Sequence, residues 1–135
     1  MEKEAEYCVN FKSDTNIEGI VALYDADDEC HIEVVLSGKK YSATSNDYFE
    51  AFSIIRKELE MIGVIPQCYA AAKNVFPSPM SRGMGGGIKA YQLSIGKQAL
   101  MKDLVNIFET SDNFEFVSVE EQESFYDQWL ASLGH

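Results

Sequence analysis

Residues 30–63 read CHIEVVLSGKKYSATSNDYFEAFSIIRKELEMIG, and they place a β-hairpin directly before an amphipathic helix. Apolar and polar side chains alternate over residues 30–36, which is the period of a half-buried strand. Ser37-Gly38 supplies a tight turn, and residues 40–43 return as a second strand. The stretch therefore predicts antiparallel pairing and disfavours a parallel, doubly wound sheet.

The helix expected after this hairpin spans about residues 45–62. We expect Thr44 or Ser45 to cap its amino end, and Gly63 permits a left-handed stop. Its apolar side chains are spaced four or three residues apart and so share one stripe: Tyr48, Phe52, Ile55, Leu59 and Ile62.

Further elements are expected on both sides of this stretch. The other apolar or β-branched segments are predicted to be strands: residues 7–12, 17–24, 64–72, 88–95 and 103–108. A helical alternative for residues 98–108 stays open. A last helix opens at Ser118, where Glu121 completes a capping box, and carries Phe125, Trp129 and Leu133 at spacings of four.

These elements predict a single α+β domain covering residues 1–135. We expect an antiparallel sheet of about five to seven strands, with two main helices (about 45–62 and 118–133) packed on one face. Apolar residues make up 46% and charged residues 24%, which is the composition of a globular chain. One core is therefore expected to suffice.

The compartment is predicted to be the cytoplasm. The first residues lack the basic start and apolar stretch of a signal peptide, and no apolar run approaches the ~20 residues of a membrane span. Cys8, Cys30 and Cys68 are odd in number and far apart, unlike the ligands of a zinc site or a redox pair. We expect them to be reduced and mostly buried.

Charge is segregated along the chain, whose net charge is −11. Residues 61–102 contain bases and no acids, whereas residues 103–135 contain acids and no bases. The net charge of −11 disfavours nucleic acid and anionic membranes as partners, because Coulomb repulsion opposes their approach unless a basic patch is segregated. The basic middle either folds against the acidic ends or contacts an anion or a partner.

The residues that carry chemistry are few, so no catalytic set is predicted. His135 is the terminal residue and His31 lies in a predicted strand. The run Asp25-Ala-Asp-Asp28 lacks the register and the distal glutamate of a calcium loop and is interpreted as a solvated turn. We expect no metal and no cofactor.

The segment 74–89 is predicted to be a long loop, because it contains two prolines and four glycines. Gly83–Gly87 does not fit a dinucleotide fingerprint or a P-loop, and a structural role for these glycines is the favoured alternative. Side chains of the segment nevertheless suit recognition, and we take them as a candidate contact site: Asn74, Ser78, Met80, Ser81, Arg82, Met84 and Lys89.

Two fates are open for Arg82. Its guanidinium either binds an external carboxylate or phosphate, or folds back onto an acid such as Asp103 or Glu109. The acidic faces are the other candidate contact, with the last helix contributing Glu120, Glu121, Glu123 and Asp127.

Several motifs together resemble a known group of proteins: Asp47–Phe52, Cys68-Tyr69, Asn74–Ser78, Met80–Arg82, Met84-Gly85, Lys89–Tyr91 and Asp103–Phe108. They are similar to a widespread family of small, uncharacterised bacterial proteins, covering about residues 30–130. Members look similar to orphan proteins found near secreted polymorphic toxins, including contact-dependent growth-inhibition systems. The resemblance implies an immunity role and supplies no catalytic residues.

The resulting hypothesis is a non-catalytic immunity protein, a monomer or weak dimer, that binds a basic toxin domain. Acidic charge speeds association with such a partner. The alternatives are a small-ligand or housekeeping binding protein with its site at residues 74–89 and, less favoured, an enzyme.

Overall fold

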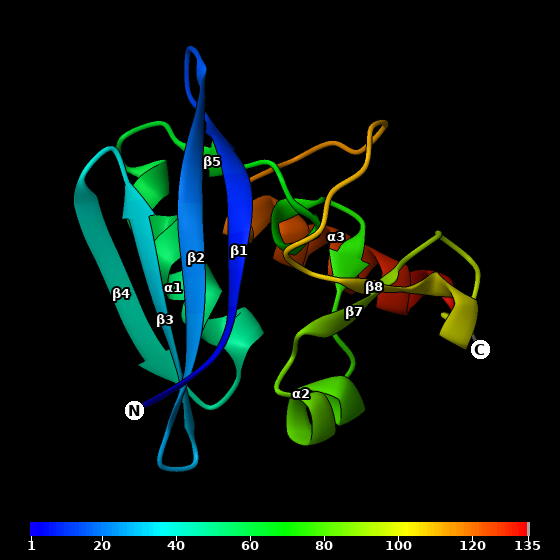
Figure 1. Ribbon diagram of the computed structural model, residues 1–135. Helices are drawn as coiled ribbons and strands as arrows, with labels where there is room; N and C mark the ends of the chain where they lie inside the picture. The colour runs from blue at the N-terminus through cyan, green and yellow to red at the C-terminus, as the bar shows by residue number, and fades with distance from the viewer. Residues whose placement is uncertain (135) are drawn as a thin grey trace.

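A computed structural model describes residues 1–134 and begins with two long antiparallel strands (Figure 1). β1 (Glu2–Lys12) pairs with β2 (Asn16–Ala26), so both strands extend beyond the expected ranges. The predicted hairpin follows as β3 (Glu29–Leu36) and β4 (Lys39–Ser45). Ser37 and Gly38 turn it with positive φ angles of 52° and 78°, as a tight hairpin requires.

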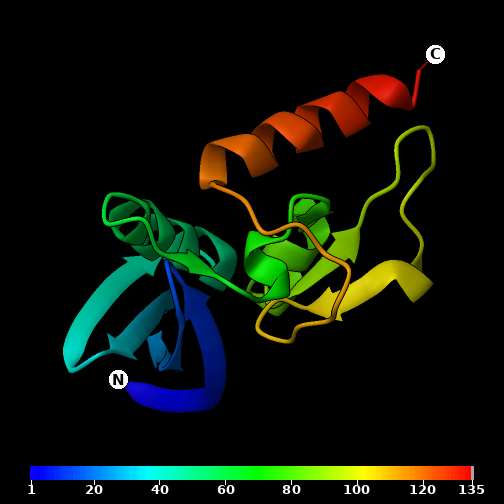
Figure 2. The ribbon, with the colours of Figure 1, turned by 90° about the horizontal axis from the view of Figure 1, so that it is seen from above.

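These strands form a five-stranded sheet in the order β4-β3-β2-β1-β5, where β5 (Ile65–Pro66) pairs with the end of β1. Ile32, Val34 and Leu36 are buried, as their alternation predicted. They face α1 (Tyr48–Glu60), which packs against β3 and β4 while the sheet curls around it (Figure 2).

Helix α1 has the predicted stripe but different ends. Tyr48, Phe52, Ile55 and Leu59 are buried, whereas Ile62 lies beyond the helix and is 60% exposed. The cap is Asp47, which accepts a hydrogen bond from the Glu50 amide, and not Thr44 or Ser45. The two expected caps are wrong because β4 continues through both of them.

A second, three-stranded sheet has the order β6-β7-β8. It consists of β6 (Val75–Phe76), β7 (Lys89–Gln92) and β8 (Leu104–Asn106). β6 was not expected, and β7 and β8 are shorter than the strands predicted at 88–95 and 103–108. A 3₁₀ turn, η2 (Met101–Asp103), precedes β8. The predicted loop at 74–89 is also wrong in part, because it contains β6 and the short helix α2 (Pro79–Gly85).

The strand predicted at residues 64–72 is wrong after Pro66. The chain there forms η1 (Tyr69–Ala71), another 3₁₀ turn. The Ala70 carbonyl accepts from two side chains, those of Arg56 and Gln122, whereas the Ala71 carbonyl accepts from the Val117 amide. Sequence alternation carries no signal for such side-chain partners.

Helix α3 (Val119–Ser132) begins as predicted, because Ser118 and Glu121 form the capping box. It packs against β6 and α1, and Gln122 and Trp129 are buried while Phe125 is only half-buried. One apolar cluster contains residues from α1 and from both sheets. The α+β class with helices packed on antiparallel sheet is confirmed. Within residues 1–134, helices are too short or too polar to span a membrane.

Candidate partner-binding surface

Arg82 of α2 is held against the start of α1. Its guanidinium lies 3.3 Å from the Asp47 carboxylate and 3.7 Å from that of Glu50. The same guanidinium lies over the rings of Phe49 and Phe76, at 5.1 and 5.3 Å from their centroids. The acids expected to pair with it, Asp103 and Glu109, are therefore the wrong ones, and Arg82 is an anchor of α2.

The glycines after α2 have the structural role that was the favoured alternative. Gly86 ends the helix with a φ of 68°, and its carbonyl accepts a hydrogen bond from the Tyr48 amide at 2.6 Å. A Cβ on Gly87 would lie 3.0 Å from the Asp47 carboxylate and 3.2 Å from the Phe49 Cβ. The glycines thus permit close approach to α1.

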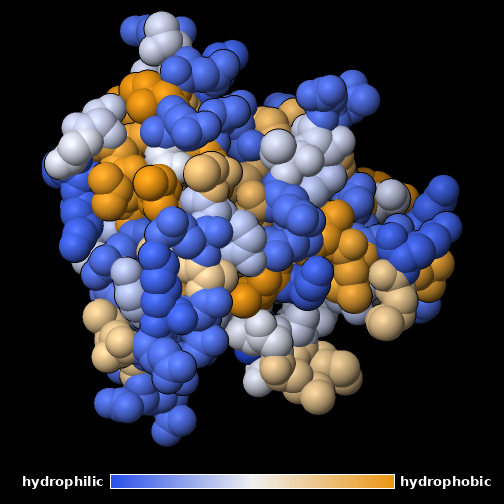
Figure 3. Space-filling view, viewed as in Figure 1, coloured by the Kyte–Doolittle hydropathy of each residue, from blue (hydrophilic) through white to orange (hydrophobic). Residues whose placement is uncertain are grey.

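Anchored in this way, α2 presents two methionines outward. Met80 and Met84 are four residues apart and are 71% and 85% exposed. Figure 3 shows α2 at the lower centre as a weakly hydrophobic projection. Flexible thioethers on an exposed helix suit contact with another protein.

The other candidate residues of this segment are spread over different places. Asn74 donates to the Leu93 carbonyl, and Ser78 caps α2 by accepting from the Ser81 amide. Lys89 lies on β7 and lines an open hollow beside β1 and β8, away from α3. Only Ser78 also borders the groove described next.

An apolar groove of about 510 Å³ lies between α3, β7 and the segment that enters α2. Its walls are mainly aromatic and aliphatic and include Phe76, Tyr91, Leu93, Tyr126, Trp129 and Leu130. Phe76 stacks on Tyr126 with ring centroids 4.1 Å apart, and Trp129 donates its indole N–H to the Lys97 carbonyl. These contacts hold the walls in place. The sequence missed this groove because its walls come from segments far apart in the chain.

Hydrophobic surface continues beyond the groove. Ile95, Leu100 and Met101 are more than half exposed in the segment that follows β7, at the right of Figure 3. A separate hydrophobic area on the outer face of β2 and β3 contains Ile20 and Val35, at the left of that view.

Acidic side chains follow the groove along α3. Glu123, Asp127 and Leu130 are spaced four and three residues apart, so they share one stripe of the helix. Both acids are exposed, and within residues 1–134 neither forms an ion pair with a lysine or arginine. Glu120 is exposed as well, whereas the Glu121 carboxylate is occupied by the capping box. The stripe thus joins free carboxylates to the groove.

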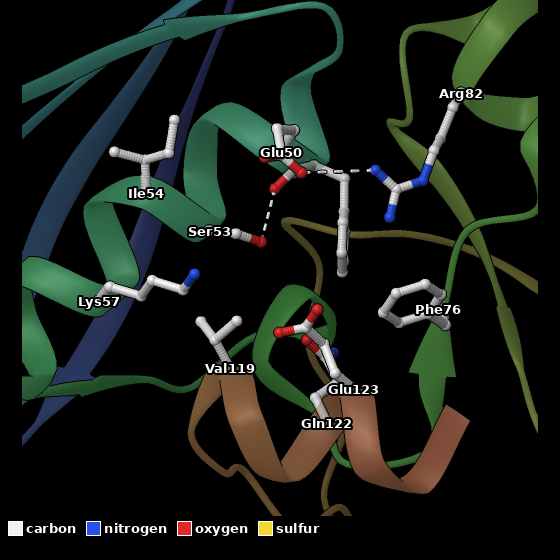
Figure 4. Close-up of a pocket in the computed structure, with 10 residues that line it drawn as sticks. Glu50, Ser53, Ile54, Lys57, Phe76, Arg82, Val119, Gln122 and Glu123 are labelled. Atoms are coloured by element: carbon white, nitrogen blue, oxygen red, sulfur yellow. Dashed lines mark hydrogen bonds and ion pairs between the residues drawn. The ribbon is translucent and has the colours of Figure 1, made fainter. Parts of the chain in front are cut away.

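A small cleft of about 80 Å³ lies at the amino end of the same stripe, between α1 and α3 (Figure 4). Glu123 from α3 and Lys57 from α1 point into it from opposite sides. Phe76 lines both this cleft and the groove, so the two hollows are neighbours along α3.

Polar side chains on the outer sheet face form a short hydrogen-bonded chain. The His31 ring bonds Thr44 at 2.7 Å and Glu33 at 3.3 Å. None of these three side chains lines any of the five hollows described for residues 1–134. The described residues also contain no group of three histidine, cysteine or acidic side chains placed to hold a metal.

In sequence comparisons, the chain matches no model of a known protein family and no curated protein. Its function is therefore inferred from the surface of the molecule.

Proposed function

We propose that this chain is a non-catalytic binding domain whose partner is a basic protein. The observation that carries the proposal is the position of Glu123 and Asp127, which form no ion pair within residues 1–134, on the same stripe of α3 as groove-lining Leu130. An apolar, aromatic centre next to a polar rim is the usual composition of a protein contact.

Charge supports a basic partner. Helix α3 contains four acids and no base, and the whole chain has a net charge of −11. Such a field attracts cationic proteins, raises their association rate and opposes binding to nucleic acid. The exposed methionines of α2, a helix whose first residue Pro79 lines the groove, add adaptable apolar contact.

Neutralisation of a basic toxin domain is the version of this role that we propose, because the motif resemblance implies it. Occlusion of a toxin requires tight binding and no chemistry by the inhibitor. The surface on α3 and α2 supports such binding, since it combines apolar contact area with charge.

A test is co-expression with a toxin domain encoded beside the gene for this chain. We expect wild-type protein to restore growth and to co-purify with the toxin domain. Loss of the complex at raised ionic strength would agree with the charged contact. Persistent toxicity at full expression, with no complex, would contradict the proposal.

A small apolar ligand is a second candidate, favoured by the volume of the groove. About 510 Å³ lies within the range of small-molecule sites. Titration with indole, followed by chemical shifts of groove residues, distinguishes the two roles. Saturable binding of indole that the partner does not displace would favour the small ligand.

A further inference from the structure

We propose that the groove on α3 takes a basic amphipathic segment of the partner, with an apolar anchor in the groove and cations beyond one end. The anchor would contact Trp129 and Leu130, and the cations would reach Asp127 and Glu123. This inference rests on the proposed function and specifies the chemistry of the contact.

The aromatic side chains make the groove suited to an anchor. Trp129 is only 9% exposed and is fixed by its hydrogen bond to the Lys97 carbonyl, whereas Leu130 beside it is 43% exposed. Tyr126 lies between Phe76 and Trp129 in a row of stacked rings. When a partner residue enters, apolar surface of the rigid aromatic wall and of the exposed aliphatic side chain beside it is removed from water.

The spacing of the acids fixes where the cations must lie. Asp127 precedes Leu130 by three residues and Glu123 precedes it by seven, which is about 4.5 and 10.5 Å along the helix axis. A partner helix lying along α3 would therefore have lysine or arginine about three and seven residues from its anchor.

Neighbouring charges determine at which end of the groove the cations of the segment lie. Arg82 is already occupied by Asp47 and Glu50, but Lys57 faces Glu123 across the cleft and reduces its attraction for a cation. Asp127 is therefore the stronger of the two contacts. Beyond the other end of the groove, a neighbouring hollow is lined by Lys97, Lys102 and Asp103, so its net positive charge disfavours a cation there.

The probes are synthetic helical peptides of about 15 residues, a length at which a helix begins to be stable. Each peptide has two leucines one helical turn apart as its anchor, and two lysines about three and seven residues from the anchor. In one peptide the lysines precede the leucines, and in the other they follow them. Matched peptides replace both lysines by glutamate or shuffle the sequence. Trp129 is the single tryptophan of the chain, so its fluorescence reports occupation of the groove.

We expect one of the two lysine peptides to bind more tightly than the other, because α3 has a direction. The glutamate and shuffled peptides should bind at least about tenfold more weakly. Equal binding of the lysine and glutamate peptides, or no binding of either lysine peptide, would overturn the inference.

Charge reversal in the chain completes the test. Asp127→Lys should weaken the lysine peptide more than Glu123→Lys does, and the double variant should prefer the glutamate peptide. The control for the double variant is Asp14→Lys with Glu18→Lys. It changes the net charge by the same amount as the double variant does, at exposed positions of the hairpin formed by β1 and β2. Equal loss in the control would show that only net charge matters and would contradict the site.

Two further outcomes separate the inference from the proposed function. A partner complex that survives Asp127→Lys and Leu130→Glu would refute this groove while leaving a binding role intact. Absence of any partner complex would refute the role itself. Sedimentation of the chain alone detects a second copy in the groove, and a dimer abolished by Leu130→Glu would contradict the basic segment.

Discussion

Arg56 and Gln122 meet inside the protein, with 2.7 Å between the guanidinium and the carboxamide oxygen. Both side chains are essentially inaccessible to solvent. Burial lowers the pKa of Arg56 to about 10, so its charge persists at neutral pH. Arg56 also donates to the Ala70 and Val117 carbonyls, and Gln122 donates to three carbonyls of the 70–75 segment. The pair therefore positions α3 relative to α1.

Removal of either side chain should destabilise the protein strongly. Arg56→Ala should lower the free energy of unfolding by about 4 kcal/mol, because it leaves buried acceptors unpaired and a cavity. Gln122→Ala should cost about 3 kcal/mol for the same reason. In a double-mutant cycle by urea denaturation, the two effects should couple by more than about 1 kcal/mol. Coupling as small as that of the exposed pair Lys73 and Glu115 would contradict this role.

Arg82 provides a second test, of the anchoring of α2. Arg82→Ala should lower the free energy of unfolding by about 2 kcal/mol, since it removes a partly buried ion pair and stacking on two rings. Amide exchange in residues 79–88 should speed up more than in β1. Exposed Lys89→Ala is the control, and an equal effect of both variants would argue against the anchor.

Gly87 and Gly38 form a matched pair for the close approach of the chain to α1. Their φ angles are 75° and 78°, but of the two only Gly87 has neighbours within 4 Å of the position that a Cβ would take. Gly38→Ala should cost about 1 kcal/mol from backbone strain, and Gly87→Ala about 2 kcal/mol more from the contacts with Asp47 and Phe49. Thermal melts give both values, and equal losses would exclude steric crowding at Gly87.

The three cysteines were expected to be mostly buried, but of the three only Cys68 is buried. Their thiols should therefore differ in reactivity. Cys8 is exposed, whereas burial raises the pKa of half-buried Cys30 and raises that of Cys68 to about 12. Because the thiolate is the nucleophile, iodoacetamide at neutral pH should label Cys8 first and Cys68 only on unfolding. Mass spectrometry of timed samples checks this order, and early labelling of Cys68 would contradict its burial.

The elements with a clear local period could be predicted from the sequence. The hairpin at 30–43 and the stripe of α1 follow from alternation and helical spacing, and the capping box places the start of α3. The fold after Pro66 could not be predicted, because its backbone is bound by segments far away in sequence. The Ala70 carbonyl accepts from the side chains of Arg56 and Gln122, and the Ala70 amide donates to the Ile107 carbonyl.

Of the candidate surface, the acids of the last helix and the two methionines of α2 could be named from the sequence, whereas the groove could not. The acids of the last helix were visible as a cluster, but the role of Arg82 depends on Asp47 and Glu50, which lie more than thirty positions away in sequence. The groove depends on the packing of α3 over β7, which no local pattern contains.

If α3 and its groove are the contact surface, binding of a partner segment should change the environment of their amides. Amide chemical-shift mapping by NMR, with the tighter lysine peptide as probe, measures this directly. We expect the largest shifts at Asp127, Trp129, Leu130 and Tyr91, with little change at Ile20 and Val35 on the outer sheet face. Shifts concentrated on that outer face, or spread evenly over the acidic residues of the chain, would show that α3 and its groove are not the contact surface.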